Sequence, residues 1–193
     1  MKIRFATENR AKLEEARQAL SRHGIEVEGI PLKLAEPDGG TVSEVARFKL
    51  EQVRKLGMDH VMVDDAGLFF KAWPGFPGVL TKRIFDKLGY RGFAKLLDGE
   101  SREAWFEGAV AVCWDGDVRV FTGVTAGMIA ELKDSLKPVP GFPFDPVFVP
   151  EGESRPLAEL SEEERLVHSY RRKALEQLAD WILTKTGKDT AVK

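Results

Sequence analysis

The chain has 193 residues, of which 43% are apolar and 31% are charged, a composition typical of a globular protein. Its 31 acidic and 29 basic residues give a net charge of −2, which argues against a protein that coats nucleic acid, because such proteins need a basic surface. No stretch approaches the ~20 apolar residues that cross a bilayer, so we expect no membrane segment. The single cysteine, Cys113, cannot form an internal disulfide, and the N-terminal apolar run is too short for a signal peptide, so we expect a cytoplasmic protein.

The first half of the chain predicts alternating strands and helices. The strands are expected at Lys2–Ala6, Ile25–Ile30, His60–Val63 and Gly67–Ala72, and the helices at Asn9–His23, Ser43–Gly57, Val79–Leu88 and Phe93–Leu97. The pair Asp64-Asp65 is expected to end a buried strand, and the segment Pro74–Gly78 is typical of a loop.

The second half predicts a β-meander followed by a helix. Its strands are expected at Arg102–Trp114, Val118–Ile129 and Val147–Val149. The sequence Asp115-Gly116-Asp117 indicates a hairpin turn, and Pro138–Pro146 a rigid loop. The capping box Ser161-x-x-Glu164 predicts one long C-terminal helix.

These elements predict a single α/β domain over residues 1–185, with a long mixed β-sheet, flanking helices and two lobes. A cleft between the lobes would be the natural ligand site. Residues 186–193 are expected to form a flexible tail.

The segment Thr7–Lys12 lies where the first strand ends and the first helix begins. Asn9 is a favourable N-cap, yet Arg10 and Lys12 place two positive charges in the first turn, where the helix dipole is already positive. An anion bound at the exposed N–H groups would make these charges favourable. The alternative is a solvated first turn with two surface bases.

Lys49 interrupts the apolar stripe of the second helix, so its ammonium must either reach solvent or meet a negative charge. A phosphate is one candidate partner, and Asp64 or Asp65 is another. Carboxylates are hard oxygen ligands that suit Mg²⁺, and Glu36 in the acidic loop could complete a metal site. The alternative for the acidic pair is a solvated turn.

The loop Phe142-Pro143-Phe144-Asp145-Pro146 presents two aromatic rings and one acid in a stiff backbone, which can stack a base or simply plug the core. On the predicted last helix, a polar and basic patch has a solvated helix face as its alternative interpretation. The patch comprises Arg165, Ser169, Arg171 and Arg172.

Taken together, these segments resemble the Ham1/RdgB inosine-triphosphate pyrophosphatase family over about residues 1–183. The family patterns occur in order as Thr7-x-Asn9-x-x-Lys12, Asp64-Asp65-Ala66-Gly67-Leu68, Gly75-Phe76-Pro77-Gly78, Phe142-Pro143-Phe144-Asp145-Pro146 with Phe148-x-Pro150-Glu151-Gly152 after it, and Leu157-Ala158-Glu159-Leu160. Each pattern is moderately specific, and five in register make the resemblance strong.

The resemblance implies an elongated two-lobed fold with a central cleft, and a role for each matching residue. The residues implied to bind the triphosphate are Thr7, Asn9, Lys12, Lys49 and Lys82. Glu36 and Asp65 would bind Mg²⁺, and Asp65 would also position or activate the attacking water. The residues implied to bind the base are Phe142, which would stack on the purine, and Phe144, Asp145, Arg165, Ser169, Tyr170 and Arg171. Family members are usually homodimers, so we expect one here.

Four positions depart from the family pattern. Glu8 replaces a glycine beside the expected phosphate site, and Ala66 removes a hydroxyl after the acidic pair. On the last helix, Tyr170 replaces a histidine and Arg165 a lysine, so base specificity can differ from that of relatives.

The implied reaction is water attack on the α-phosphorus of ITP, dITP or XTP, releasing pyrophosphate and cleansing the nucleotide pool. One alternative is the same reaction on other modified or standard triphosphates. Another is a nucleotide-binding module without catalytic activity.

Overall fold

The computed structural model describes residues 1–133 and 135–187, and the chain divides into two compact units. The first unit comprises Met1–Asp65, Gly108–Gly123 and the described residues from Arg171 onward. The second comprises Ala66–Glu107 and Val124–Tyr170. Three strands of a seven-stranded sheet contribute residues to both units: β3 (Val61–Phe70), β5 (Glu103–Trp114) and β6 (Asp117–Ile129).

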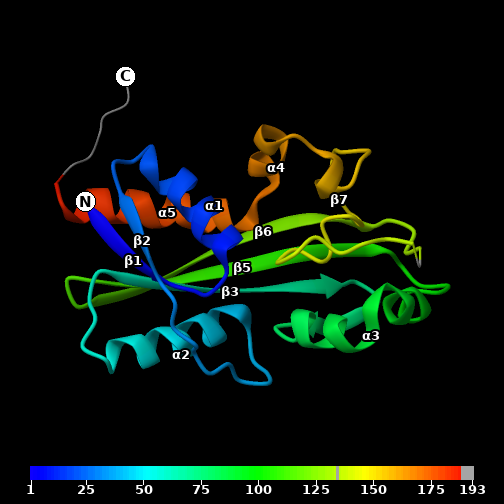
Figure 1. Cartoon of the computed structure of the whole chain (residues 1–193), viewed down its shortest axis with the longest axis horizontal. Coiled ribbons are helices and arrows are strands. Elements are labelled where there is room, and N and C mark those ends of the chain that lie inside the picture. The colour runs from blue at the N-terminus through cyan, green and yellow to red at the C-terminus, as the bar shows by residue number, and fades with distance from the viewer. Residues whose placement is uncertain (134, 188–193) are drawn as a thin grey trace. The chain divides into compact units, whose positions relative to one another are not determined.

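In the first unit, β1 (Lys2–Ala6) pairs in parallel with β2 (Glu26–Ile30) on one side and with β3 on the other. Helices α1 (Arg10–Ser21) and α5 (Tyr170–Lys185) cover one face of this sheet, and α2 (Val42–Arg54) covers the other (Figure 1). The face under α1 and α5 is filled by buried apolar side chains from all these layers, including Phe5, Leu20, Met62, Val112 and Leu178.

The second unit has its own aromatic core. Here β4 (Trp73–Gly78) pairs antiparallel with β3, and β7 (Phe148–Pro150) pairs antiparallel with β6. The unit also holds α3 (Thr81–Leu96), a short 3₁₀ helix (Leu157–Glu159) and α4 (Glu162–His168). Its core side chains include Phe70, Phe93, Phe106, Phe144 and Phe148.

The predicted α/β class with a mixed sheet is confirmed. The division into one domain and the cleft between lobes stay predictions, and residues 188–193 of the predicted tail lie outside the described residues. Among the helices of the described chain, none has the length and apolar character needed to cross a membrane.

Four details of the secondary structure differ from the prediction. Asp64 and Asp65 lie inside the continuous strand β3 instead of ending a strand, and the Pro74–Gly78 segment forms most of strand β4. The two helices predicted between 79 and 97 form a single element, α3, which is kinked at Gly89, where a positive φ of 55° departs from helical geometry. The single C-terminal helix is instead two, because Ser169 adopts an extended conformation between α4 and α5.

Candidate functional site

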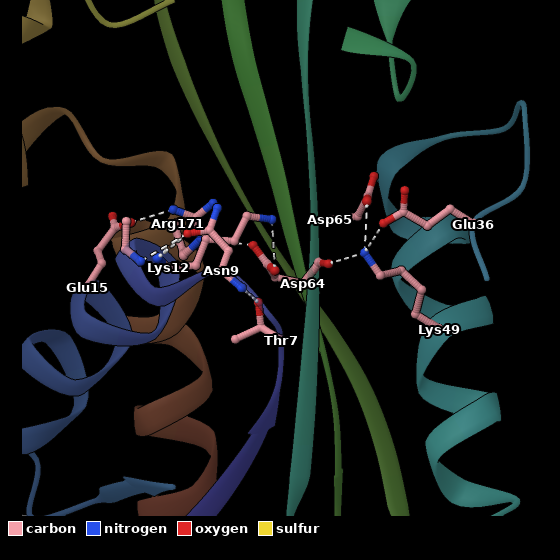
Figure 2. Close-up of polar contacts among 10 residues, drawn as sticks. Thr7, Asn9, Lys12, Glu15, Glu36, Lys49, Asp64, Asp65 and Arg171 are labelled. Atoms are coloured by element: carbon pink, nitrogen blue, oxygen red, sulfur yellow. Dashed lines mark hydrogen bonds and ion pairs between the residues drawn. The ribbon is translucent and has the colours of Figure 1, made fainter. Parts of the chain in front are cut away.

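The alternation of side chains along β3 sends two consecutive acids to opposite faces of the sheet. Asp64 follows Met62 onto the face covered by α1 and α5, and Asp65 follows Val63 onto the face covered by α2. Figure 2 shows the result: Asp64 points toward Lys12 and Arg171, whereas Asp65 points toward Lys49 and Glu36. All of these residues belong to the first unit.

The Asp64 carboxylate is held by two cations. Its Oδ1 accepts a hydrogen bond from Lys12 Nζ at 3.1 Å, and its Oδ2 accepts one from Arg171 Nε at 2.9 Å. Burial alone would raise the pKa of Asp64, but the charges of Lys12, Arg171 and Lys49 outweigh it and hold that pKa well below its usual range. Asp64 is therefore a permanently charged anchor whose two oxygens are both engaged.

Arg171 connects this anchor to α1. Its side chain is only 3% exposed, and its Nη1 donates to Glu15 while its Nε donates to Asp64. Glu15 lies three residues after Lys12 on α1, so both side chains point to the same region (Figure 2). The ion pairs thus tie the first helix, strand β3 and the start of α5 together.

The start of α1 is closed by its own polar side chains. Asn9 is the N-cap: its Oδ1 accepts hydrogen bonds from the backbone N–H groups of Ala11 and Lys12 at 3.0 and 3.2 Å. The hydroxyl oxygen of Thr7 in turn accepts the N–H of Asn9 at 3.1 Å. Thr7 and Asn9 thereby fix the first turn that carries Lys12. Glu8, the departure in this segment, is exposed.

Lys49 is buried on the other face, at 8% exposure, on a helix whose start is fixed by a Thr41–Glu44 capping box. Its Nζ donates to Glu36 Oε1 at 2.8 Å, to the carbonyl oxygen of Asp64 at 2.8 Å and to Asp65 Oδ1 at 3.2 Å. Burial would lower the pKa of Lys49, but the charges of Asp65 and Asp64 outweigh it and raise that pKa. Lys49 is therefore a stable buried cation.

One carboxylate oxygen of Asp65 has no hydrogen-bond donor among the described residues. Its Oδ2 is buried and accepts no hydrogen bond from any residue that the structure describes. Burial raises the pKa of Asp65 to about 6, although Lys49 and Lys12 act in the opposite direction. A buried carboxylate oxygen without a donor is costly unless a further group binds it. Together with the nearby Glu36 carboxylate, Asp65 Oδ2 supplies the hard oxygen ligands that suit Mg²⁺.

A second cluster of metal-ligating side chains lies at the other end of β3 in the first unit. Among the described residues, Asp59, His60 and Asp115 bring one ligand atom each within 4.8 Å of one another. The two oxygens of Asp59, however, accept the backbone N–H groups of His60 and Gly116, and His60 pairs with Asp115. Local hydrogen bonding thus accounts for this cluster.

The residues expected to bind the nucleotide base lie mostly in the second unit, and they differ in how far they are buried. Phe144 is 1% exposed and packs edge-on against Phe85 and Phe93, so its ring is part of the core and is not open to stack on a base. Phe142, in the same loop, is half-buried. Tyr170 stacks on Phe106 with ring centroids 5.2 Å apart.

The other base and phosphate candidates of this unit are placed as follows. Ser169 and Asp145 are half-buried, whereas Arg165 on α4 and Lys82 in the first turn of α3 are exposed. Arg171, the remaining base candidate, belongs to the first unit and is engaged by Asp64 and Glu15.

Sequence reasoning missed two features of the ionic network: the participation of Glu15, and the pairing of Asp64 with Lys12 and Arg171. The available signal for Glu15 was its spacing of three residues from Lys12, which places both on neighbouring positions of one helix. Nothing in the sequence indicated that Asp64 would meet Arg171, because 107 residues separate them.

The fold and the site define an α/β protein that holds two lysines and an arginine against consecutive buried carboxylates, a charge arrangement suited to a phosphorylated ligand and a divalent cation. The sequence model of the Ham1 family matches residues 3–181, and the chain belongs to that family. A dITP/XTP pyrophosphatase of Methanopyrus kandleri is 42% identical over 183 residues, covering 94% of this chain and 96% of that protein. One from Thermococcus kodakarensis is 39% identical over 184 residues, covering 94% and 97%.

Solved structures agree with this membership. The Ham1 protein of Staphylococcus aureus superimposes with a TM-score of 0.72 at 26% identity, covering 96% of this chain and all of that chain. A HAM1 protein from Coxiella burnetii gives a TM-score of 0.76 at 26% identity, covering 96% and 99%.

Proposed function

We propose that this protein hydrolyses nonstandard purine nucleoside triphosphates, such as ITP, dITP and XTP, to the monophosphate and pyrophosphate. The observation that carries the proposal is that two lysines, Lys12 and Lys49, pair with the consecutive acids Asp64 and Asp65, one on each face of β3. Relatives named dITP/XTP pyrophosphatase, which match this chain over nearly their whole length, support the substrate class.

In the proposed reaction, water attacks the α-phosphorus, a new P–O bond forms, and the bond to the bridging oxygen of the β-phosphate breaks. Asp65 accepts the proton of the attacking water, a role that suits a carboxylate whose pKa is raised to about 6. Lys12 and Lys49 offset the charge that develops on the leaving pyrophosphate. Thr7 and Asn9 hold the helix turn that positions Lys12.

Glu36 and Asp65 are the residues proposed to hold Mg²⁺. The unpartnered Asp65 Oδ2 and the nearby Glu36 carboxylate fit this role, because both offer hard oxygen ligands. When bound there, the ion would supply Lewis-acid neutralisation of phosphate charge.

At the base end, we propose that Phe142 stacks on the purine and that Asp145, Arg165, Ser169 and Tyr170 address its edge. A 6-oxo purine presents an acceptor where adenine presents an amino donor, so side chains that donate would discriminate between the two. Arg171 acts first through Asp64 and Glu15, whose carboxylates its guanidinium already contacts.

The test is a product analysis with ITP, dITP, XTP, GTP and ATP in the presence of Mg²⁺, resolved by chromatography. We expect pyrophosphate and monophosphate from the 6-oxo nucleotides with unusual bases, and orthophosphate release would overturn the reaction. Asp65→Asn should abolish turnover, whereas the matched control Asp98→Asn removes an exposed carboxylate and should not. Binding of nucleotide without any product would instead establish a non-catalytic module.

Two further expectations stay proposals. A homodimer is expected from the family resemblance, and light scattering of the purified protein would give its mass in solution. A cytoplasmic location is expected from the single cysteine and is open to fractionation of the source cells.

A further inference from the structure

The ammonium group of Lys49 has used up its hydrogen-bonding capacity. An ammonium carries three donors, and Lys49 Nζ has three acceptors within hydrogen-bonding distance. They are Glu36 Oε1, the Asp64 carbonyl oxygen and Asp65 Oδ1 (Figure 2). No N–H of Lys49 is therefore left for a phosphate oxygen while these contacts persist.

Two of those three acceptors are the carboxylates proposed to hold the divalent cation. Lys49 joins them from the two sides, at 2.8 Å from Glu36 and 3.2 Å from Asp65. A divalent cation on the same carboxylates would lie close to the ammonium, and the two positive charges would repel each other strongly because Lys49 and Asp65 are buried. The two cations therefore compete for one pair of anions.

We propose that Lys49 is an internal substitute for the metal: its ammonium holds Glu36 and Asp65 together, and metal binding releases it to bind phosphate. This inference rests on the proposed function for the metal site at Glu36 and Asp65 and for the identity of the phosphate ligand. The four-carbon stem of lysine allows the head group to move while α2 stays in place. The bond to the Asp64 carbonyl, which is not a metal-site carboxylate, can persist as the head group turns.

The arrangement has two functional consequences. Metal and phosphate should bind cooperatively, because the first to arrive lowers the cost for the second. In the free protein, Lys49 also compensates the charge of the buried Asp65 carboxylate, so that this carboxylate is not left unpaired when no metal is bound.

The first test measures the affinity of the nucleotide-free protein for Mn²⁺ alone, by the electron paramagnetic resonance signal of the free ion. Lys49→Met removes the competing cation, and we expect it to bind Mn²⁺ at least about fivefold more tightly than the wild type, the lower end of typical coupling. Lys55→Met is the matched control, because Lys55 lies on the exposed C-cap of the same helix and its loss changes the net charge equally. Equal or weaker Mn²⁺ binding by Lys49→Met would overturn the inference.

A second test needs no variant and so remains informative if Lys49→Met does not fold. Lysines of the wild-type protein are acylated briefly with and without Mg²⁺, and each is quantified by mass spectrometry. We expect Mg²⁺ to increase the labelling of Lys49 relative to Lys55, and unchanged labelling would contradict the release. Competition by Lys49 without any triphosphate hydrolysis would refute only the proposed function. Hydrolysis without competition would refute only this inference.

Discussion

Replacing Arg171 by methionine tests whether the buried ionic network stabilises the first unit. Methionine keeps much of the apolar stem but removes the guanidinium that contacts Asp64 and Glu15. The Arg171 and Asp64 side chains are 3% and 5% exposed, so Asp64 would lose one of its two cations away from water. Removing one member of a buried pair costs about 3–5 kcal/mol. For a chain of this size we therefore expect the melting temperature to fall by about 6–20 °C.

The assay is thermal unfolding followed by circular dichroism, with Arg54→Met as the matched control. Arg54 also pairs with a glutamate, Glu51, at 2.9 Å, but these side chains are 37% and 46% exposed. Such an exposed pair contributes only about 0–1 kcal/mol, because water screens it. A double-mutant cycle with Asp64→Asn would isolate the contribution of the Arg171–Asp64 pair. If Arg171→Met lowers the melting temperature no more than Arg54→Met does, the burial argument is wrong.

Two further predictions concern Asp65 and the aromatic loop. The pKa of Asp65 is raised from 3.8 to about 6, so between these values the folded protein binds more protons than the unfolded chain and loses stability as pH rises. The Asp65→Asn variant lacks this titration. In urea unfolding, its free energy of unfolding relative to that of the wild type should therefore rise by up to about 3 kcal/mol between about pH 4 and pH 7.5. If the difference between the two proteins is the same at both pH values, the raised pKa of Asp65 is wrong. Phe144→Ala should cost about 3–5 kcal/mol of stability because it empties a core position. Phe142→Ala should mainly raise KM. If instead Phe144→Ala mainly raised KM and Phe142→Ala mainly lowered stability, Phe144 would be the ring that stacks on the base.

Several features were predictable because they depend on neighbours in sequence. The periodicity of the second helix placed Lys49 on its buried face, and the structure confirms both its burial and its pairing with Asp65. Asn9 was predicted as an N-cap from the local change between strand and helix, and its side chain does accept two backbone N–H groups. Local rules suffice when the deciding partners are within one helical turn.

Other features escaped prediction because their causes lie far along the chain. Two consecutive acids are typical of a turn, yet Asp64 and Asp65 sit in mid-strand. The cations Lys12 and Arg171 that compensate Asp64 are 52 and 107 residues away. The break at Ser169 was hidden by an uninterrupted helical pattern, since the sequence on either side favours a helix. Phe144 illustrates the same point, because only the packed core distinguishes it from Phe142.

The alternation of side chains along β3 makes the parity of that strand a constraint on evolution and engineering. Deleting or inserting one residue between Val61 and Asp64 would rotate every later side chain of the strand to the opposite face. The position now facing Lys12 and Arg171 would then face α2, even though no acid had been substituted. A two-residue change would restore the faces. Variation in length should therefore collect in the surrounding loops, and any change inside the strand should come in pairs.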